Sequence, residues 1–369
     1  MKIYKGFLTM TVFCLLTGWY GCYAQDIHFT LVAPPKDAPW SQVVGMSQGH
    51  EGFLWIATQA GLYKYDGHRY TSYLHDPTNS NSIGDNRLYG VLTDKNGIIW
   101  IGTYLKGLDR LDPATGIITH FQHLANNSNT ISNDTVTSIM QDKQGMLWIG
   151  TFNGLNRYNP QTKTFTRYYH IAGDSASLSN NLVNVVYEDH EGAIWIGTGT
   201  PFFGNRYKGG GLNRFNPNTG NFKRYLHDPD NPQSIADNRV MSIFEDSHSN
   251  LWVGTAGHGL QILHRSSGVF THYNYNSLHP ETLSRPPLKR YFDYAADFIS
   301  FITEDVSGRI WIGTLQGGIN VYDPSTQKVT YYGSDKNSKE KLPTNLFYCA
   351  YRTKDGTLWI GNWYSNPFA

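Results

Sequence analysis

Seven segments of the sequence share one short pattern, and this repetition restricts the fold more than any other feature does. Each segment reads Leu/Ile-Trp-Ile/Val-Gly/Ala-Thr/Asn, and the tryptophans are Trp55, Trp100, Trp148, Trp195, Trp252, Trp311 and Trp359. Neighbouring tryptophans are 45 to 59 residues apart. A period of this length is typical of one four-stranded blade of a β-propeller.

Each repeat contains four strand patterns, which we call a, b, c and d. An alternating stretch such as 136–141 predicts strand a, and the Trp segment predicts strand b. Strand c begins at a Gly-Leu or Gly-Ile pair such as Gly154-Leu155, and strand d ends on an aromatic residue such as Tyr168. Asp with a following Gly between a and b, and Asp/Asn-Pro between c and d, favour tight turns. The sequence therefore predicts an all-β, seven-bladed propeller of four-stranded blades over residues 25–369.

The last repeat is incomplete. After Asn362 the sequence contains no Gly-Leu strand and no terminal aromatic strand. We expect Ile27–Leu31, which precedes the first full repeat, to supply the outermost strand of blade seven. One strand of that blade would still be missing, so we expect the chain to be a truncated version of a longer protein.

The first residues have the pattern of a targeting segment. Lys2 and Lys5 precede an apolar run, and a small-x-small cleavage pattern ends at Ala24. We interpret residues 1–24 as a cleaved signal peptide, with a lipoprotein anchored through Cys22 as the alternative. No later apolar stretch has the length of a spanning helix, so we expect no membrane anchor after cleavage. Processing would leave Cys349 as the single cysteine, without a disulfide.

Composition excludes some classes of partner. The formal net charge is +1 and charged residues make up only 16% of the chain, so no basic surface for nucleic acid is expected. The histidines and cysteines show no metal-ligand spacing, and no glycine-rich phosphate loop is present. We therefore predict no metal, no cofactor and no catalytic residue.

The repeats resemble those of the two-component regulator propeller family. Its signature, Asp-x-x-Gly-x-Leu-Trp-Ile-Gly-Thr-x-x-Gly-Leu-x-Arg-Tyr-Asp, is similar to residues 142–159, and the resemblance extends over residues 41–362. It implies a periplasmic sensor region of a hybrid two-component histidine kinase, of the kind found in gut Bacteroidetes, that recognises oligosaccharides. It also implies a second propeller or a second copy as partner. The kinase, receiver, transmembrane and DNA-binding parts of that family are not in this sequence.

Differences between the repeats indicate where a ligand would bind. Blade four has a long insertion between strands b and c, and the d–a connection before blade six is also long. In an antiparallel blade these two connections lie on the same face, and variable loops on a fixed scaffold are typical recognition sites. Aromatic and cationic side chains in the insertions suit an acidic glycan, although two long solvated loops that pack on each other remain the alternative. The candidate ligand residues there are Phe202, Phe203, Arg206, Tyr207, Lys208, Arg285, Arg290 and Tyr291.

Shorter loops of the same face add Tyr104, Lys106, His258 and Gln316 as candidate ligand residues, with Phe152 nearby. Asparagine and arginine recur in the d–a loops, where the asparagines are expected to cap strand a. These residues are Asn86, Arg87, Asn133, Asn181, Asn238 and Arg239. The seven tryptophans and the aspartate of each a–b turn are expected to be structural.

Three functions are compatible with these features. The first is a carbohydrate-sensing module, which the resemblance favours. The second is a propeller that serves only as an interaction module. The third is a propeller glycosidase or lyase, because the Asp-x-x-Gly-x-x-Trp turn is loosely similar to the Asp-box of sialidases. No arginine cluster with an acid and a tyrosine nucleophile can be assigned, which argues against the third.

Overall fold

The computed structural model of the protein describes residues 27–34, 42–200, 209–273, 298–334 and 338–363. The chain separates into two compact units, Met1–Pro34 and Pro35–Ala369. In the first unit, residues 27–34 form no strand, so the prediction that Ile27–Leu31 is the outermost strand of blade seven is wrong. An outermost strand must hydrogen-bond to strand c of its blade, and no strand c of blade seven lies within the described ranges.

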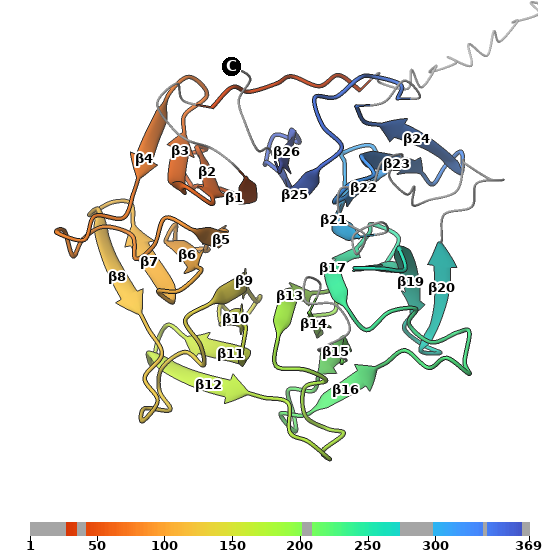
Figure 1. The fold of residues 1–369 in the computed structure, drawn as a ribbon, viewed down its shortest axis with the longest axis horizontal. Coiled ribbons are helices and arrows are strands. Elements are labelled where there is room, and N and C mark those ends of the chain that lie inside the picture. The colour runs from red at the N-terminus through yellow and green to blue at the C-terminus, as the bar shows by residue number, and fades with distance from the viewer. Residues whose placement is uncertain (1–26, 35–41, 201–208, 274–297, 335–337, 364–369) are drawn as a thin grey trace, which may run out of the picture. The chain divides into compact units, whose positions relative to one another are not determined.

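The described part of the second unit consists of antiparallel strands joined by loops (Figure 1). Strand a of successive blades is β1 (Val43–Gln48), β5 (Leu88–Thr93), β9 (Val136–Gln141), β13 (Val183–Glu188), β17 (Val240–Glu245), β21 (Ile299–Glu304) and β25 (Phe347–Arg352). Strand b is β2 (Leu54–Thr58), β6 (Ile99–Thr103), β10 (Leu147–Thr151), β14 (Ile194–Gly199), β18 (Leu251–Thr255), β22 (Ile310–Thr314) and β26 (Leu358–Asn362).

Strands c and d are described for the first six blades. Strand c is β3 (Gly61–Tyr65), β7 (Leu108–Asp112), β11 (Gly154–Asn159), β15 (Gly210–Phe215), β19 (Leu260–His264) and β23 (Ile319–Asp323). Strand d is β4 (Tyr70–Tyr73), β8 (Ile117–Phe121), β12 (Thr164–Tyr168), β16 (Phe222–Tyr225), β20 (Val269–Tyr273) and β24 (Lys328–Tyr332). Each strand d ends on an aromatic residue, as the sequence predicts.

The sheets of this unit form a ring with strand a of every blade on the inside (Figure 1). Each inner strand contacts the next, from β1 through β5, β9, β13, β17 and β21 to β25, and β25 in turn contacts β1. Six sheets have four strands in the order a–b–c–d, and the seventh, β25–β26, has two among the described residues. The predicted β-propeller is present, and its seventh blade is the partial one.

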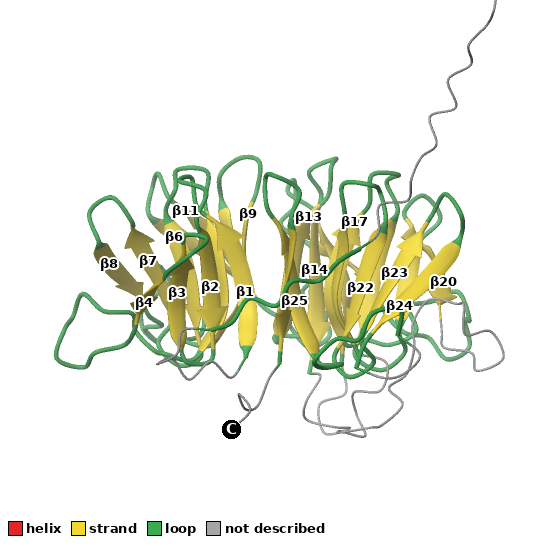
Figure 2. Cartoon of the chain, turned by 90° about the horizontal axis from the view of Figure 1, so that it is seen from above, coloured by secondary structure: helices red, strands yellow, loops and turns green. Residues whose placement is uncertain are grey.

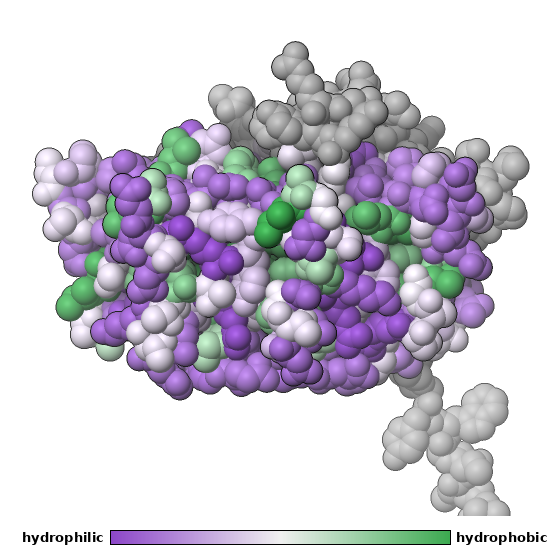
Figure 3. Space-filling model, turned by 90° about the horizontal axis from the view of Figure 1, so that it is seen from below, coloured by the Kyte–Doolittle hydropathy of each residue, from purple (hydrophilic) through white to green (hydrophobic). Residues whose placement is uncertain are grey.

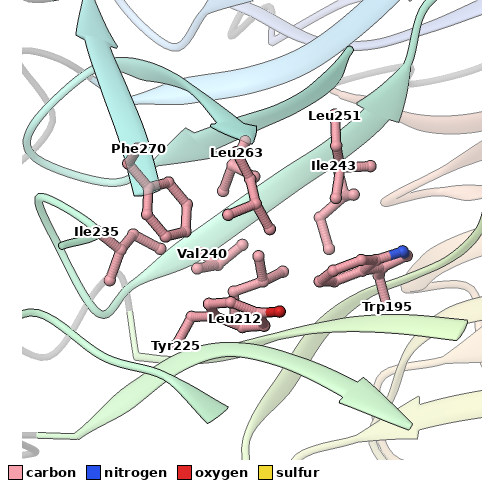
Figure 4. Close-up of a cluster of buried hydrophobic side chains, with 10 residues drawn as sticks. Trp195, Leu212, Tyr225, Ile235, Val240, Ile243, Leu251, Leu263 and Phe270 are labelled. Carbon is pink, nitrogen blue, oxygen red and sulfur yellow. The ribbon is translucent and has the colours of Figure 1, made fainter. Parts of the chain in front are cut away.

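The core lies between neighbouring blades. Trp195, Leu212 and Tyr225 of blade four pack on Val240, Leu263 and other apolar side chains of blade five (Figure 4). The tryptophans of blades one to six are at most 5% exposed, which confirms that they belong to the core. Trp359 of blade seven is half-buried. Each complete blade is thus apolar on both sides, and the ring covers both sides of those that lie between two other complete blades.

Aspartate at the start of the a–b turn holds the tryptophan of strand b. In blades two to six its Oδ2 accepts a hydrogen bond from the indole Nε1 at 2.7–2.9 Å, as in Asp142–Trp148. The Oδ1 atom accepts backbone N–H groups of the turn, for example that of Met146. This arrangement confirms the structural role of the aspartate. Blade one has Gly49 at this position, and the buried Nε1 of Trp55 has no partner among the described residues.

The ring closes between blades seven and one with the contacts used between other neighbours. The backbone N–H of Lys354 donates to Gln48 Oε1 at 2.9 Å, just as that of Lys143 donates to Glu188 Oε2 at 2.9 Å between blades three and four. The Cys349 thiol lies 3.6 Å from the carbonyl oxygen of Val43. The partial seventh blade therefore occupies a regular blade position.

Viewed edge-on, the outer side of the ring is mostly hydrophilic, with apolar residues in small separate groups (Figure 3). Two of the more exposed apolar residues cover strand-c glycines: Leu74 lies over Gly61 and Leu226 over Gly211. Within the described ranges, no helix is long and apolar enough to cross a membrane.

Candidate functional site

The connections between strands divide between the two faces of the ring (Figure 2). The a–b and c–d turns emerge on one face, and the b–c and d–a connections emerge on the other, which we call the loop face. The prediction that b–c and d–a connections share one face is therefore confirmed. Apart from the longer connection before blade six, the d–a loops, such as residues 74–87 and 169–182, are equal in length, and they form much of the loop face.

Asparagine and aspartate side chains tie together the two ends of each d–a loop. Asn181 Oδ1 accepts the backbone N–H of His170, and the imidazole Nδ1 of His170 lies 2.7 Å from the carbonyl oxygen of Leu178. Asn133 lies one position earlier in the repeat, where its Oδ1 accepts the N–H of Thr135 at the start of strand a. Thus the recurring asparagines are structural, but most of them close the loop instead of capping strand a. The loop-closing pairs are Asn86–His75, Asp134–His123, Asn181–His170, Asn238–His227 and Asn345–Ser334.

Every strand a carries a β-bulge at its second residue. The bulged residues are Val44, Tyr89, Thr137, Asn184, Met241, Ser300 and Tyr348. A bulge redirects a side chain out of the regular pleat. These side chains lie where the inner strand meets the loop face, so they belong to the central mouth of the ring. Thr137, Asn184 and Ser300 hydrogen-bond to the inner strand of the next blade, whereas Tyr89 and Tyr348 are aromatic.

An aromatic cluster forms at this mouth from Arg87, Tyr89, Tyr104 and Phe152. The ring of Tyr89 lies 5.7 Å from that of Tyr104 and 6.1 Å from that of Phe152. The Arg87 guanidinium lies over the Tyr104 ring, 4.4 Å from its centroid. At the same mouth, Tyr348 of blade seven packs against apolar residues of blades one and two and against a buried group that includes Phe298 and Leu315. Blades two and three thus contribute to the aromatic cluster.

Burial affects two phenols at this mouth, those of Tyr89 and Tyr348. It raises the pKa of Tyr89, and Tyr104 raises that pKa further, while Arg87 acts in the opposite direction. Burial also raises the pKa of Tyr348, with smaller contributions from Tyr89 and Cys349. Both hydroxyl groups are therefore neutral hydrogen-bond donors at physiological pH. Aromatic faces, phenolic O–H groups and a guanidinium together can stack on a sugar ring and pair with an anionic substituent.

A second polar group lies on the loop face in blade five. Arg239 binds Asp237 through Nε and Nη2, and His258 Nδ1 lies 3.1 Å from Asp237 Oδ2. Burial by itself would raise the pKa of the Asp237 carboxyl, but the hydrogen bonds from His258 and Arg239 hold it well below its ordinary value. The carboxylate neutralises Arg239, so Arg87, whose side chain is 49% exposed, is the more available cation.

The sequence profile of the two-component regulator propeller matches residues 82–105, 130–153, 177–200, 234–257 and 341–364. Each match runs from the end of a d–a loop through strand b of the same blade. The chain carries two-component regulator propeller repeats. The matches cover blades two, three, four, five and seven. Blade one of this regulator propeller lacks the turn aspartate, and blade six follows the longer d–a connection.

Solved structures with the same architecture confirm the fold. The extracellular domain of a protein described as a hybrid two-component system from B. thetaiotaomicron has a TM-score of 0.69 and 24% identity, over 88% of this chain and 39% of that one. PorZ, a surface component of the type-IX secretion system of Porphyromonas gingivalis, has a TM-score of 0.61 and 16% identity, over 91% of this chain and 48% of that one.

A virginiamycin B lyase from Staphylococcus aureus, in a catalytically inactive form with quinupristin, has a TM-score of 0.59 and 12% identity, over 89% of this chain and 97% of that one. The regulator propeller spans about two fifths of the extracellular-domain chain that it matches. No curated protein matches the sequence.

The structure describes four of the predicted ligand residues. Tyr104 belongs to the aromatic cluster, and Lys106 is exposed beside it with its backbone N–H bound to Thr103 Oγ1. His258 is exposed and bound to Asp237, whereas Gln316 is only 1% exposed and lies beneath the surface. The other candidates, Phe202, Phe203, Arg206, Tyr207, Lys208, Arg285, Arg290 and Tyr291, lie outside the described residues.

Sequence comparison missed Tyr89 and Tyr348. The sequence pattern predicts strand a as a regular alternation, which does not single out either residue. The bulge adds no residue to the repeat length because all seven blades share it, so the spacing between repeats does not show it. Within the described ranges, no group of three His, Cys, Asp or Glu side chains is arranged to hold a metal ion.

Proposed function

We propose that this chain is the ligand-sensing propeller of a hybrid two-component system, exported to the periplasm, and that it binds an oligosaccharide at the aromatic cluster of the loop face. The expected ligand carries a carboxylate or sulfate. The observation that carries the proposal is the position of the Arg87 guanidinium over Tyr104, beside Tyr89 and Phe152.

The chemistry of the cluster supports this proposal. Sugar rings present C–H groups on one side that pack on aromatic faces, and Arg can pair with a carboxylate or sulfate through two N–H groups. Arg87 is paired only loosely with Asp85, at 3.9 Å, so a ligand anion can compete for it. Tyr104, a predicted ligand residue, belongs to this cluster, and Lys106 is exposed two residues further along the same b–c loop.

The test is calorimetric titration of neutral and acidic oligosaccharides into the chain expressed from Gln25. We expect Arg87→Ala and Tyr104→Ala each to weaken binding of an acidic oligosaccharide by about tenfold or more, since each would remove a charge-assisted or stacking contact. Lys95→Ala is the matched control, because Lys95 is an exposed cation in an a–b turn on the other face. This change is expected to leave both affinity and melting temperature unaltered.

Two results would contradict the proposal. If Arg87→Ala and the unmodified chain bind the acidic oligosaccharide with equal affinity, the aromatic cluster is not the binding site. Release of products from any oligosaccharide by the purified chain would favour an enzyme. The likeness to a lyase at 12% identity shows a shared fold only and carries no activity to this chain.

A further inference from the structure

The first residue of each inner strand directs its backbone carbonyl toward the preceding blade. In blade three, the N–H of Phe152 donates to the carbonyl of Thr135, and the bulge follows one residue later. Hydrogen-bonded and non-bonded pairs alternate along antiparallel strands, so Val136 and its partner Thr151 exchange no hydrogen bond. The carbonyl oxygen of Val136 faces blade two, where a Cβ added to Gly102 would lie 3.2 Å from it.

At six of the seven junctions, a side chain of the preceding blade donates to this carbonyl. Thr137, Asn184 and Ser300, each the bulged residue of its strand, donate at 2.5–3.0 Å. At three junctions the donor occupies another position, in the pairs Gln59–Leu88, Ser242–Ile299 and Cys349–Val43. The junction of blades two and three is the exception, because the carbonyl of Val136 accepts no hydrogen bond from the described residues.

Tyr89 accounts for this exception. It occupies the bulge of blade two, where blades three, four and six have Thr, Asn or Ser, and its ring packs with Tyr104 and Phe152. The next residue, Gly90, has no side chain that could donate in its place. Val136 is 0% exposed, so its carbonyl is buried as well as unpaired, which costs free energy. A departure from a rule that the other junctions obey is expected where function requires it.

We propose that Tyr89 binds the sugar ring of the ligand, whereas Arg87 recognises its anionic group. This inference rests on the proposed function and divides the recognition of an acidic saccharide into two parts. Tyr89 and Arg87 both contact the ring of Tyr104, so they lie on either side of one aromatic side chain. The aromatic face packs on the C–H groups of a sugar whatever its charge, and the guanidinium pairs with a carboxylate or sulfate.

Paired probes separate the two contributions. Uronate-containing and sulfated oligosaccharides are titrated calorimetrically into the chain expressed from Gln25, each beside its carboxyl-reduced or desulfated form. We expect Tyr89→Thr to weaken binding of both members of a pair by about tenfold, because it removes a stacking contact that does not depend on charge. The ratio of the two affinities should stay the same in this variant, whereas Arg87→Ala should bring the ratio close to one.

A second comparison tests whether the carbonyl of Val136 is unpaired. Tyr89→Thr and Tyr89→Val both remove the ring and have the same shape, but only the first introduces a hydroxyl. This hydroxyl can donate to the Val136 carbonyl, as that of Thr137 donates to Val183. We expect the melting temperature of Tyr89→Thr to exceed that of Tyr89→Val by about 2 °C.

Two further variants are controls. Val44→Thr introduces a hydroxyl at the bulge of blade one, where the Leu88 carbonyl already accepts Gln59, so it should not raise the melting temperature. Tyr89→Phe keeps the ring and should bind both members of each pair about as tightly as the unmodified chain does. It also keeps the test informative if the smaller substitutions at Tyr89 do not fold.

The outcomes distinguish this inference from the proposed function. If Arg87→Ala weakens binding of the acidic probe but Tyr89→Thr does not, the proposed function stands and the role of Tyr89 is wrong. A tenfold loss in Tyr89→Phe, or equal melting temperatures for Tyr89→Thr and Tyr89→Val, would also overturn the inference. If the unmodified chain binds none of the probes, the proposed function fails and this inference fails with it.

Discussion

At the scale of single residues, the propeller is organised around the pair of turn aspartate and strand-b tryptophan. The carboxylate satisfies both the indole N–H and the N–H groups of the turn, so one side chain fixes a hairpin and anchors the blade core. A buried polar atom without a partner costs free energy. Blade one has Gly49 in place of the aspartate. It therefore allows the free energy contributed by the indole–carboxylate hydrogen bond to be compared within one protein.

We predict that Trp148→Phe lowers the free energy of unfolding by about 1–2 kcal/mol more than Trp55→Phe does. Both changes remove the same volume, but only Trp148→Phe leaves a buried carboxylate oxygen, Asp142 Oδ2, without its donor. Urea denaturation of the two variants measures the difference in unfolding free energy, provided that the slope of this free energy against urea concentration is the same for both. Equal losses would show that the indole–carboxylate bond adds no net stability.

His120 and Asp109 form a pH-dependent pair in blade two. His120 Nδ1 lies 2.6 Å from Asp109 Oδ1, and this hydrogen bond raises the pKa of His120 although burial opposes the shift. The pair therefore stabilises the fold below the ordinary histidine pKa of about 6.5, and this contribution is lost as the pH rises through the higher folded-state value.

Asp109→Asn is expected to remove this pH dependence. Asn156 occupies the same position in blade three and accepts the Ser132 N–H, as Asp109 accepts that of Gly84, so the loop contact is kept. Relative to this variant, the unmodified chain should lose about 0.5 kcal/mol of unfolding free energy between pH 5.5 and 8.5. The value is small because 33% of the imidazole is exposed and solvent screens the pair. If the unfolding free energies of the two proteins change in parallel with pH, the prediction is wrong.

At the scale of the strand, the bulge in each strand a links neighbouring blades and shapes the mouth of the ring. Where the bulged residue is Thr137, Asn184 or Ser300, its side chain binds a carbonyl of the next inner strand. Where it is Tyr89 or Tyr348, the same backbone geometry presents an aromatic ring to the mouth. The same β-bulge therefore supports packing between blades at some positions and the candidate site at others.

Thr137→Val should destabilise the chain by about 1 kcal/mol. Valine has the shape of threonine but lacks the hydroxyl that donates to the Val183 carbonyl at 2.5 Å. Thr137→Ser keeps this donor and should cost less. Thermal and urea unfolding of both variants give the comparison, and a larger loss in Thr137→Ser would mean that the methyl group, not the bond, stabilises this position.

At the scale of the whole ring, stability depends on the junction between blade seven and blade one. This junction repeats the turn-to-strand bond of other neighbours through Gln48, but it lacks the cover of a described c–d hairpin. Cys349 lies at the junction, beside Val43, and burial raises the pKa of its thiol to about 12. Its reactivity therefore reports whether the ring is closed.

In the chain expressed from Gln25, Gln48→Ala should speed the reaction of Cys349 with a thiol reagent at pH 8 by about tenfold. The variant removes the acceptor for the Lys354 N–H and loosens the junction, which exposes the thiol. Gln141→Ala removes the equivalent bond to Lys95 between blades two and three and is the control. A similar increase in Gln141→Ala would indicate general loosening instead of opening at the junction.

Much of the fold could be predicted from the sequence because it depends on sequence patterns within single blades. The Trp segments, the Gly-Leu pairs and the terminal aromatics each depend on residues within one blade, and the structure places strands such as Val136–Gln141 where they predict. The turn aspartates were also recognisable, since Asp142 and Trp148 lie in one hairpin. The prediction for Ile27–Leu31 was the exception. An outermost strand needs strand c of its blade to pair with, and no strand c of blade seven lies within the described ranges.

The candidate site depends on contacts that only the closed ring creates. Tyr89 and Tyr348 belong to blades two and seven, far apart in the sequence, and both lie at the loop-face end of inner strands that surround the axis of the propeller. Their direction is set by a bulge that leaves the repeat length unchanged. Local patterns determine blades, whereas the meeting of side chains at the axis is a property of closure, and for this reason only the tertiary structure decided which residues share the site.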